Sequence, residues 1–182
     1  MKVRILLWGM VLSLLCGAAC ADGAFWVRYS ATLNQKMATR SGPGTEYTEE
    51  LGTHAQRTQI VVLQQEMGGS VPWAMVEFSY KGGLYRAYTG MKRINTTQSI
   101  PWADENPQEA LVLNDVRVFY GPGQQYVPRK QLLAVGMAVH VLATEQGYAL
   151  IDYYETIDER VRAWAPVSAL SILGADEWLA NG

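Results

Sequence analysis

Two cysteines and two histidines are the side chains of this sequence best suited to nucleophilic or metal chemistry. Cys16 and Cys20 lie in an apolar N-terminal stretch, whereas His54 precedes a strand-like run and His140 lies inside another. Metal sites need several clustered ligands, and these histidines occupy unrelated sequence contexts. We interpret each histidine as a single packed or exposed side chain, and we expect no metal and no cofactor.

The acidic residues do not form a catalytic arrangement either. Glu49-Glu50 and Asp158-Glu159 are adjacent pairs, and neighbours on an extended segment point to opposite faces. We interpret both pairs as solvated turns. The sequence has no Gly-x-Ser-x-Gly or His-Glu-x-x-His motif and no phosphate-binding or dinucleotide-binding glycine pattern. An enzyme is not expected, since its site would have to form between two halves of the chain from scattered acids and histidines.

Aromatic side chains are the remaining candidates for binding. Six of them occur in matching places in the two halves of the chain, and we expect each set to line a groove for peptides or sugar rings. The candidate ligand-binding residues are Trp73, Tyr148, Tyr47, Tyr126, Tyr88 and Trp164. Packing is the competing interpretation, and it is the favoured one for all but Trp73 and Tyr148, because most large aromatic side chains are substantially buried.

A turn motif occurs twice and indicates a duplication. Residues 40–47 read Arg-Ser-Gly-Pro-Gly-Thr-Glu-Tyr, and residues 119–126 read Phe-Tyr-Gly-Pro-Gly-Gln-Gln-Tyr. Proline fixes one backbone angle, and the flanking glycines can take positive φ without steric cost. Each copy therefore predicts a sharp turn with a tyrosine at a set distance beyond it. Repetition at a long interval, with matching residues downstream, indicates two copies of one unit.

The segments after each turn have the composition of β-strands. Runs rich in β-branched residues occupy 58–63 and 137–142, and no helix-length amphipathic segment interrupts either half. Residues 73–78 match 148–153 position for position. In the first of these segments we assign Val76 to the core, which places Trp73 on the opposite face, where a small barrel can be partly open. The pattern predicts an all-β sandwich or small barrel, twice over.

The N-terminal residues predict export. Lys2 and Arg4 precede an apolar run at 5–15, which has the length of a signal-peptide core and is too short to cross a bilayer. An Ala-Cys-Ala site follows, and we expect cleavage before Asp22. The mature protein is then periplasmic, envelope-associated or secreted. It has no cysteine and no transmembrane span.

Lipid attachment at Cys20 is the second alternative for this region. It ranks lower because Gly17 stands where the usual lipobox has a bulky aliphatic residue.

Cleavage before Asp22 removes two basic residues and no acid, so the formal net charge changes from −2 to −4. A mildly acidic protein has no general attraction for nucleic acid, which we exclude as a partner.

The ordered set of motifs resembles the bacterial Src homology 3 (SH3) domain family. Its signature is Arg-Ser-Gly-Pro-Gly-x-x-Tyr, followed by Gly-Trp-x-x-Val and a closing Gly-Trp-Val with a final apolar residue. The first copy keeps residues 40–44, Tyr47, Trp73 and Val76, and the second keeps residues 121–123, Tyr126, Gly147, Ile151 and 163–166 through Leu170. The resemblance covers about 37–94 and 112–170. The second copy has Phe119-Tyr120 in place of Arg-Ser, and both copies have alanine for the last glycine.

The resemblance implies an all-β protein made of two tandem small SH3-like β-barrels joined by a short linker, after a cleaved signal peptide. We expect a signal peptide at 1–21, a first barrel with its N-terminal lead-in at 22–94, a linker at 95–108, a second barrel at 109–172 and a tail at 173–182.

The resemblance also implies a function in the cell envelope. The expected protein is a non-catalytic exported binding module that recognises peptidoglycan stem or cross-bridge peptides, or another envelope component, through aromatic grooves. The alternative is a structural or adaptor protein that binds another envelope protein.

Overall fold

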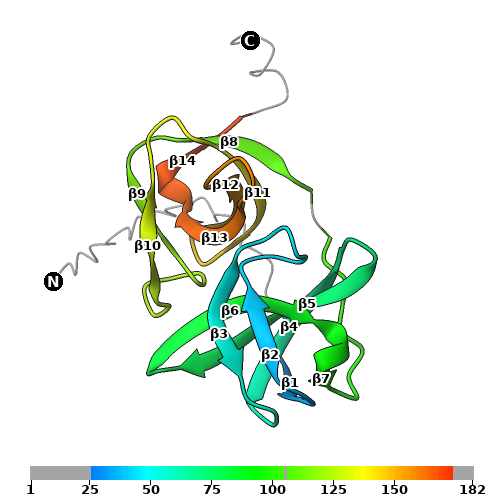
Figure 1. Ribbon diagram of the computed structural model, residues 1–182. Coiled ribbons are helices and arrows are strands. Elements are labelled where there is room, and N and C mark those ends of the chain that lie inside the picture. Colours follow the sequence, from blue (N-terminus) through cyan, green and yellow to red (C-terminus); the bar gives the residue numbers. More distant parts are fainter. Residues whose placement is uncertain (1–25, 105, 174–182) are drawn as a thin grey trace, which may run out of the picture.

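The computed structural model of the chain describes residues 26–104 and 106–173. Its regular structure there is β-strand apart from two short 3-10 turns. The strands form two antiparallel sheets, which Figure 1 shows one above the other. No helix in the described part of the chain is long and apolar enough to cross a membrane. The predicted signal peptide, Phe25 and most of the C-terminal tail lie outside these residues.

The first sheet is built from residues 29–95 and has the strand order β3-β2-β6-β5-β4-β1-β7. Its elements are β1 (Tyr29–Leu33), β2 (Met37–Arg40), β3 (Glu49–His54), β4 (Gln59–Gly68), β5 (Val71–Tyr80), β6 (Gly83–Gly90), the 3-10 turn η1 (Met91–Arg93) and β7 (Ile94–Asn95).

The second sheet is built from residues 108–172 and has the order β10-β9-β13-β12-β11-β8-β14. Its elements are β8 (Gln108–Val112), β9 (Val116–Phe119), β10 (Pro128–Leu133), β11 (Ala138–Glu145), β12 (Tyr148–Tyr154), β13 (Arg160–Pro166), the 3-10 turn η2 (Val167–Ala169) and β14 (Leu170–Ile172).

The two strand orders are the same once each label is raised by seven. The all-β prediction is therefore confirmed, and the repeat in the sequence corresponds to a repeat in topology. Each predicted strand segment lies on a strand: 58–63 overlaps β4, 137–142 overlaps β11, and 73–78 and 148–153 lie within β5 and β12.

One interpretation of the acidic pairs is wrong. Glu49 and Glu50 belong to β3, where Glu49 is opposite Arg40 and Glu50 is opposite Thr39. Backbone pairing with β2 makes this segment a strand and not a turn. Charged side chains are common on an outermost strand, where they discourage pairing with other chains. Asp158 and Glu159, by contrast, lie between β12 and β13.

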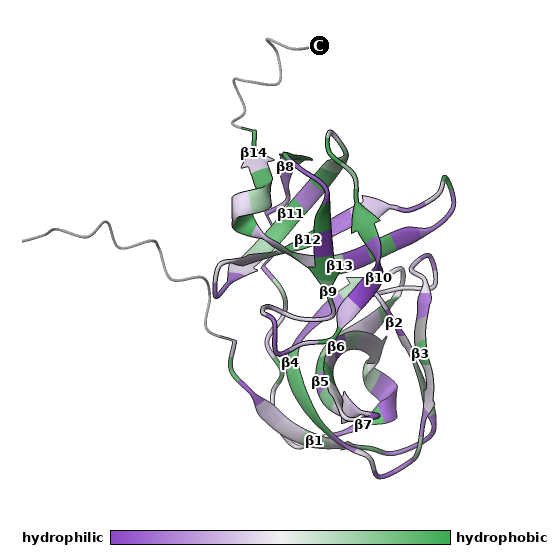
Figure 2. Cartoon of the chain, turned by 90° about the vertical axis from the view of Figure 1, so that its left-hand side faces the viewer, coloured by the Kyte–Doolittle hydropathy of each residue, from purple (hydrophilic) through white to green (hydrophobic). Residues whose placement is uncertain are grey.

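Each sheet encloses its own apolar core. Val76 and Met37 are fully buried in the first, and Ile151 and Val118 are fully buried in the second. In Figure 2, hydrophobic segments in green occur along the strands of both sheets. The assignment of Val76 to a core face therefore agrees with the structure.

The predicted linker packs against the first sheet. Gln65 of β4 donates its backbone N–H to the carbonyl of Pro101 at 2.8 Å and accepts from the N–H of Ala103 at 2.7 Å. Ile100 is buried in the first core. Residues 100–103 therefore run beside β4 as an added extended segment, and apolar Ile100 holds them there.

The first glycine of each Gly-Pro-Gly turn is required because a larger residue would not fit. A Cβ added to Gly42 would overlap the ring of Tyr47, and one added to Gly121 would overlap the ring of Tyr126. The third residue of the motif has positive φ in both copies, +138° at Gly44 and +125° at Gly123. The motif therefore folds the tyrosine back over its own turn.

We expect Gly42→Ala to lower the free energy of unfolding by about 1–3 kcal/mol, because overfilling a packed site forces its neighbours to shift. Chemical denaturation measures the change. Gly90→Ala is the matched control, since a Cβ there meets no atom within 4 Å. Equal stability of the two variants would contradict the proposed role of the Tyr47 ring.

His54 is a buried histidine at the end of β3. Its ring packs edge-on against Phe78 and Tyr80, with centroid distances of 4.6 and 4.9 Å. Its Nε2 atom is buried and has no hydrogen-bond partner among the described residues. Burial lowers the pKa of His54, because the charged imidazolium would lose its hydration.

This burial predicts a dependence of stability on pH. The unfolded chain takes up a proton on His54 below its ordinary pKa of about 6.5, whereas the folded chain resists it, so stability falls as the pH is lowered from about 7 to 5. His54→Phe removes that proton uptake. We expect its denaturation midpoint to change less over this pH range than that of the wild type, and parallel profiles would contradict the assignment.

Candidate functional site

The two sheets meet through a third cluster of buried side chains. Its buried members come from equivalent places in both sheets: Leu63, Met75, Tyr88, Leu142, Leu150 and Trp164. Trp73, Phe119 and Tyr148 pack against it as partly buried residues. The face of β5 opposite the first core is therefore covered by the second sheet, and Met75 on that face is 1% exposed.

This contact corrects the expectation of an open face. The sequence alternation assigns one face of β5 and β12 to a core, and the structure buries both faces. The physical reason is the duplication: each small sheet presents a second apolar face, and the two faces cover each other.

The structure brings the six predicted aromatic residues together at this contact. Tyr47, Tyr126, Tyr88 and Trp164 are buried, each at most 4% exposed. Trp73 and Tyr148 are partly buried at its margin. These six side chains therefore lie where the two halves of the chain pack together.

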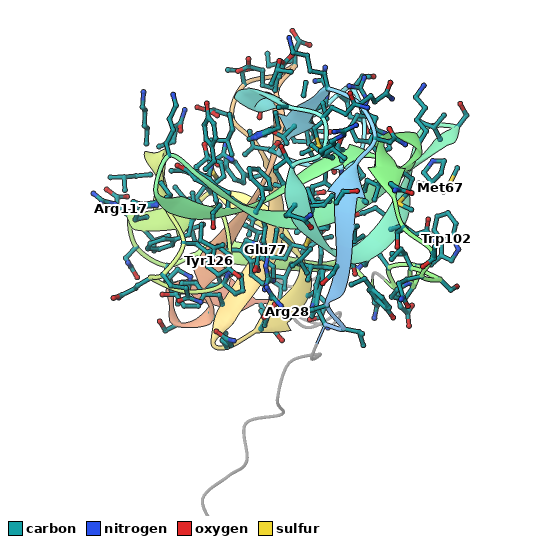
Figure 3. The ribbon with its side chains drawn as sticks, turned by 90° about the horizontal axis from the view of Figure 1, so that it is seen from below. Arg28, Met67, Glu77, Trp102, Arg117 and Tyr126 are labelled. Carbon is teal, nitrogen blue, oxygen red and sulfur yellow. The ribbon has the colours of Figure 1, made fainter. Side chains whose placement is uncertain are left out.

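A carboxylate of the first sheet is held by a tyrosine of the second. The Tyr126 hydroxyl donates to Glu77 Oε2, and Arg86 donates from Nε to the same oxygen at 3.0 Å. Arg28, which precedes β1, also donates to Glu77. Figure 3 shows Arg28, Glu77 and Tyr126 converging from different parts of the chain.

The same arrangement occurs with the sheets exchanged. The Tyr47 hydroxyl of the first sheet donates to Asp152 Oδ2 of the second at 2.7 Å. Arg162 donates to Asp152 from Nε at 2.7 Å, and Arg160 donates from Nη2 at 2.7 Å. Asp152 is thus the counterpart of Glu77, and Arg162 is the counterpart of Arg86.

Arg86 and Arg162 also form hydrogen bonds from one sheet to the other. Arg86 Nη1 donates to Glu145 Oε2 at 2.5 Å, and Arg162 Nη1 donates to both carboxylate oxygens of Glu66 at 2.8 Å. Arg162 Nη1 also donates to the Tyr88 hydroxyl at 2.9 Å. Each buried arginine thus bonds one carboxylate of its own sheet and one of the other sheet.

Backbone pairing reinforces the crossing. Isolated parallel bridges join Tyr47 to Arg160 and Leu84 to Tyr126. The N–H of Thr48 donates to the Arg160 carbonyl, and the N–H of Val127 donates to the Leu84 carbonyl, both at 3.2 Å. The contact is therefore approximately two-fold symmetric in its backbone as well as in its side chains.

The titration of these groups follows from their surroundings. Burial acts to raise the pKa of Glu77, but the hydrogen bonds from Arg28, Tyr126 and Arg86 outweigh it and hold the pKa below its ordinary value. Burial raises the pKa of Tyr126 to about 12, and raises that of Tyr47 still further. Both hydroxyls therefore stay protonated and donate to carboxylates at neutral pH.

The tryptophans outside the matched segments have different environments. Trp26 packs on the inter-sheet cluster, with its ring centroid 6.1 Å from that of Trp164 and the Arg86 guanidinium 5.8 Å from the ring. Trp102 in the linker is 56% exposed. Of these two tryptophans, Trp26 contributes to the inter-sheet contact.

A groove of about 340 Å³ lies beside Trp73 in the first sheet. Val71 and Pro72 of the β4–β5 hairpin contribute apolar surface next to the indole, and Arg40, Lys92 and Arg93 contribute basic groups. The other lining residues are Ala38, Thr45, Thr89 and Gly90. None of the residues lining this groove is acidic, so it combines an apolar wall with positive charge.

A comparison with models of protein families, with curated proteins and with solved structures found no match. In the described residues, no group of three or more His, Cys, Asp and Glu side chains is placed to hold a metal ion.

Sequence reasoning missed the charged residues of the inter-sheet contact. Glu77 and Asp152 occupy equivalent positions inside apolar strands, and so do Arg86 and Arg162. The available signal was a charge of the same sign at the same strand position in both copies. Exposed positions of a duplicated chain do not need the same charge in both copies, so a repeated charge inside an apolar strand indicates a buried partner.

We expect Arg162→Met to lower the free energy of unfolding by about 3–5 kcal/mol, because it leaves the buried carboxylates of Asp152 and Glu66 without their shared cation. Denaturant unfolding measures the loss. Lys130→Met removes an exposed cation from β10 and should change stability by no more than about 0.5 kcal/mol. Similar small effects in both variants would show that the Arg162 contacts contribute little.

Proposed function

We propose that this chain is a non-catalytic, exported binding module of two tandem SH3-like barrels that recognises cell-wall peptides or another envelope component. The observation that carries the proposal is the groove beside Trp73, because it offers a ligand both an aromatic side chain and apolar and basic surface. Of the six predicted aromatics, Trp73 is the one that lines it. The duplicated turn and the repeated strand order support the tandem arrangement.

A second candidate function is that of an adaptor for another envelope protein. Met67 and Trp102 favour it, since both are more than half exposed and lie on the same side of the molecule in Figure 3. Trp102 pairs through its backbone with Gln65, two residues before Met67. Exposed Trp and Met side chains are frequent in protein–protein contacts.

Sedimentation with purified peptidoglycan tests the proposed function, using the protein that begins at Asp22. We expect the wild type to sediment with the wall and Val71→Asp to lose at least about tenfold in affinity, because a carboxylate is placed on the apolar wall of the groove. Val71 is exposed, so its substitution leaves the cores intact. Val135→Asp places the same charge at an exposed position of the second half and should bind as the wild type does.

Absence of wild-type binding at low salt and high protein concentration would overturn the wall-peptide proposal. The adaptor function would then be tested by Trp102→Ser, with capture of a defined envelope partner as the measurement.

A further inference from the structure

The two halves of the chain differ where the groove lies. At the inter-sheet contact, equivalent positions carry side chains of the same kind: Tyr47 and Tyr126, Glu77 and Asp152, Arg86 and Arg162, Glu66 and Glu145, Leu63 and Leu142. The shared topology makes this correspondence unambiguous. The structural contact therefore needs both copies of these residues.

The basic residues of the groove have no basic counterpart in the second half. Arg40 at the end of β2 corresponds to Phe119 at the end of β9. Lys92 and Arg93 of η1 correspond to Ser168 and Ala169 of η2. All three positive charges are thus specific to the first half.

The apolar wall of the groove is also specific to the first half. Glu66 faces Trp73 across the β4–β5 hairpin, and the six residues 67–72 connect them. In the second half Glu145 faces Tyr148, with only residues 146–147 between them. The longer hairpin supplies Val71 and Pro72, and so an insertion and three substitutions are located around one groove.

Two of the three basic side chains are held by the backbone. Arg40 Nη1 donates to the carbonyls of Tyr47 and Thr45 at 2.6 and 3.2 Å, and Arg93 Nη1 donates to the Lys36 carbonyl at 2.9 Å. Such bonds fix the position of each guanidinium without neutralising its charge. Lys92 is exposed to solvent. An otherwise acidic chain therefore keeps a local excess of positive charge here.

We propose that the groove of the first half binds a short peptide through its carboxylates, with an aliphatic side chain of the peptide against Val71 and Trp73, and that the second half has no such site. The inference rests on the proposed function and names the chemistry of its ligand. Guanidinium and ammonium groups form charge-assisted hydrogen bonds with carboxylates, and the apolar wall distinguishes a peptide from a simple anion.

Fluorescence anisotropy with a synthetic probe tests the inference. The probe is the stem pentapeptide Ala-D-γ-Glu-Lys-D-Ala-D-Ala, labelled at its N-terminus, and its comparison is the same peptide with both carboxylates amidated. We expect the free acid to bind the protein at least about tenfold more tightly than the amide, because the amide loses the charge-assisted bonds.

Lys92→Glu and Ser168→Glu form a matched pair of variants. They introduce the same charge at equivalent positions of η1 and η2. We expect Lys92→Glu to weaken binding of the free acid by about tenfold or more and Ser168→Glu to leave it unchanged. Circular dichroism confirms that both variants are folded.

Three results would overturn the inference. They are equal affinity for the acid and the amide, equal effects of the two variants, and displacement of the peptide by inorganic phosphate at the concentration of the probe. If the wild type sediments with the wall but its affinity is insensitive to Lys92→Glu, the carboxylate inference fails and the proposed function stands. If the wild type does not bind the wall, the wall-peptide function itself fails, and the inference fails with it.

Discussion

The structure depends on two buried carboxylates whose partners come from opposite halves of the chain. Glu77 is held by Tyr126, and Asp152 is held by Tyr47. A buried charge is strongly destabilising unless it is paired and hydrogen-bonded. Arginines of its own half pair with each carboxylate, but the tyrosine hydroxyl that adds to its hydrogen bonds comes from the other half. A unit of this size also buries only about 60% of its unfolded surface, which leaves little margin for uncompensated groups. The hydrogen bonds of both carboxylates therefore need the two sheets together, in one relative placement.

This requirement explains why the Gly-Pro-Gly-x-x-Tyr motif is repeated. The first glycine leaves room for the tyrosine ring, and the glycine after proline takes positive φ. The ring is thereby turned over its own loop, and its hydroxyl reaches the carboxylate of the other sheet. Tyr47 and Tyr126, for which the sequence favours packing over ligand contact, are buried donors between the sheets, and the raised pKa of each keeps its hydroxyl protonated.

The sequence contained enough local information to predict strands but not to predict their partners. The repeated turn and the β-branched runs identified an all-β duplication, because turn chemistry and strand composition act over a few residues. The sequence predicts a partly open face at Trp73 because alternation in β5 says nothing about what covers either face. Glu77 and Arg86 were not identified because their partners, Tyr126 and Glu145, lie 49 and 59 residues away along the chain.

The comparison of the two halves separates structural from ligand-binding constraints. A residue that maintains the inter-sheet contact is needed in both copies, because the contact is nearly symmetric and each copy completes the other. A residue that binds a ligand is needed only where the ligand sits. The proposed peptide site assigns Arg40, Lys92 and Arg93 to the second kind, and Phe119, Ser168 and Ala169 stand at the equivalent positions without altering the strand order. Duplication thus lets one half change its surface while the buried contact holds both halves in place.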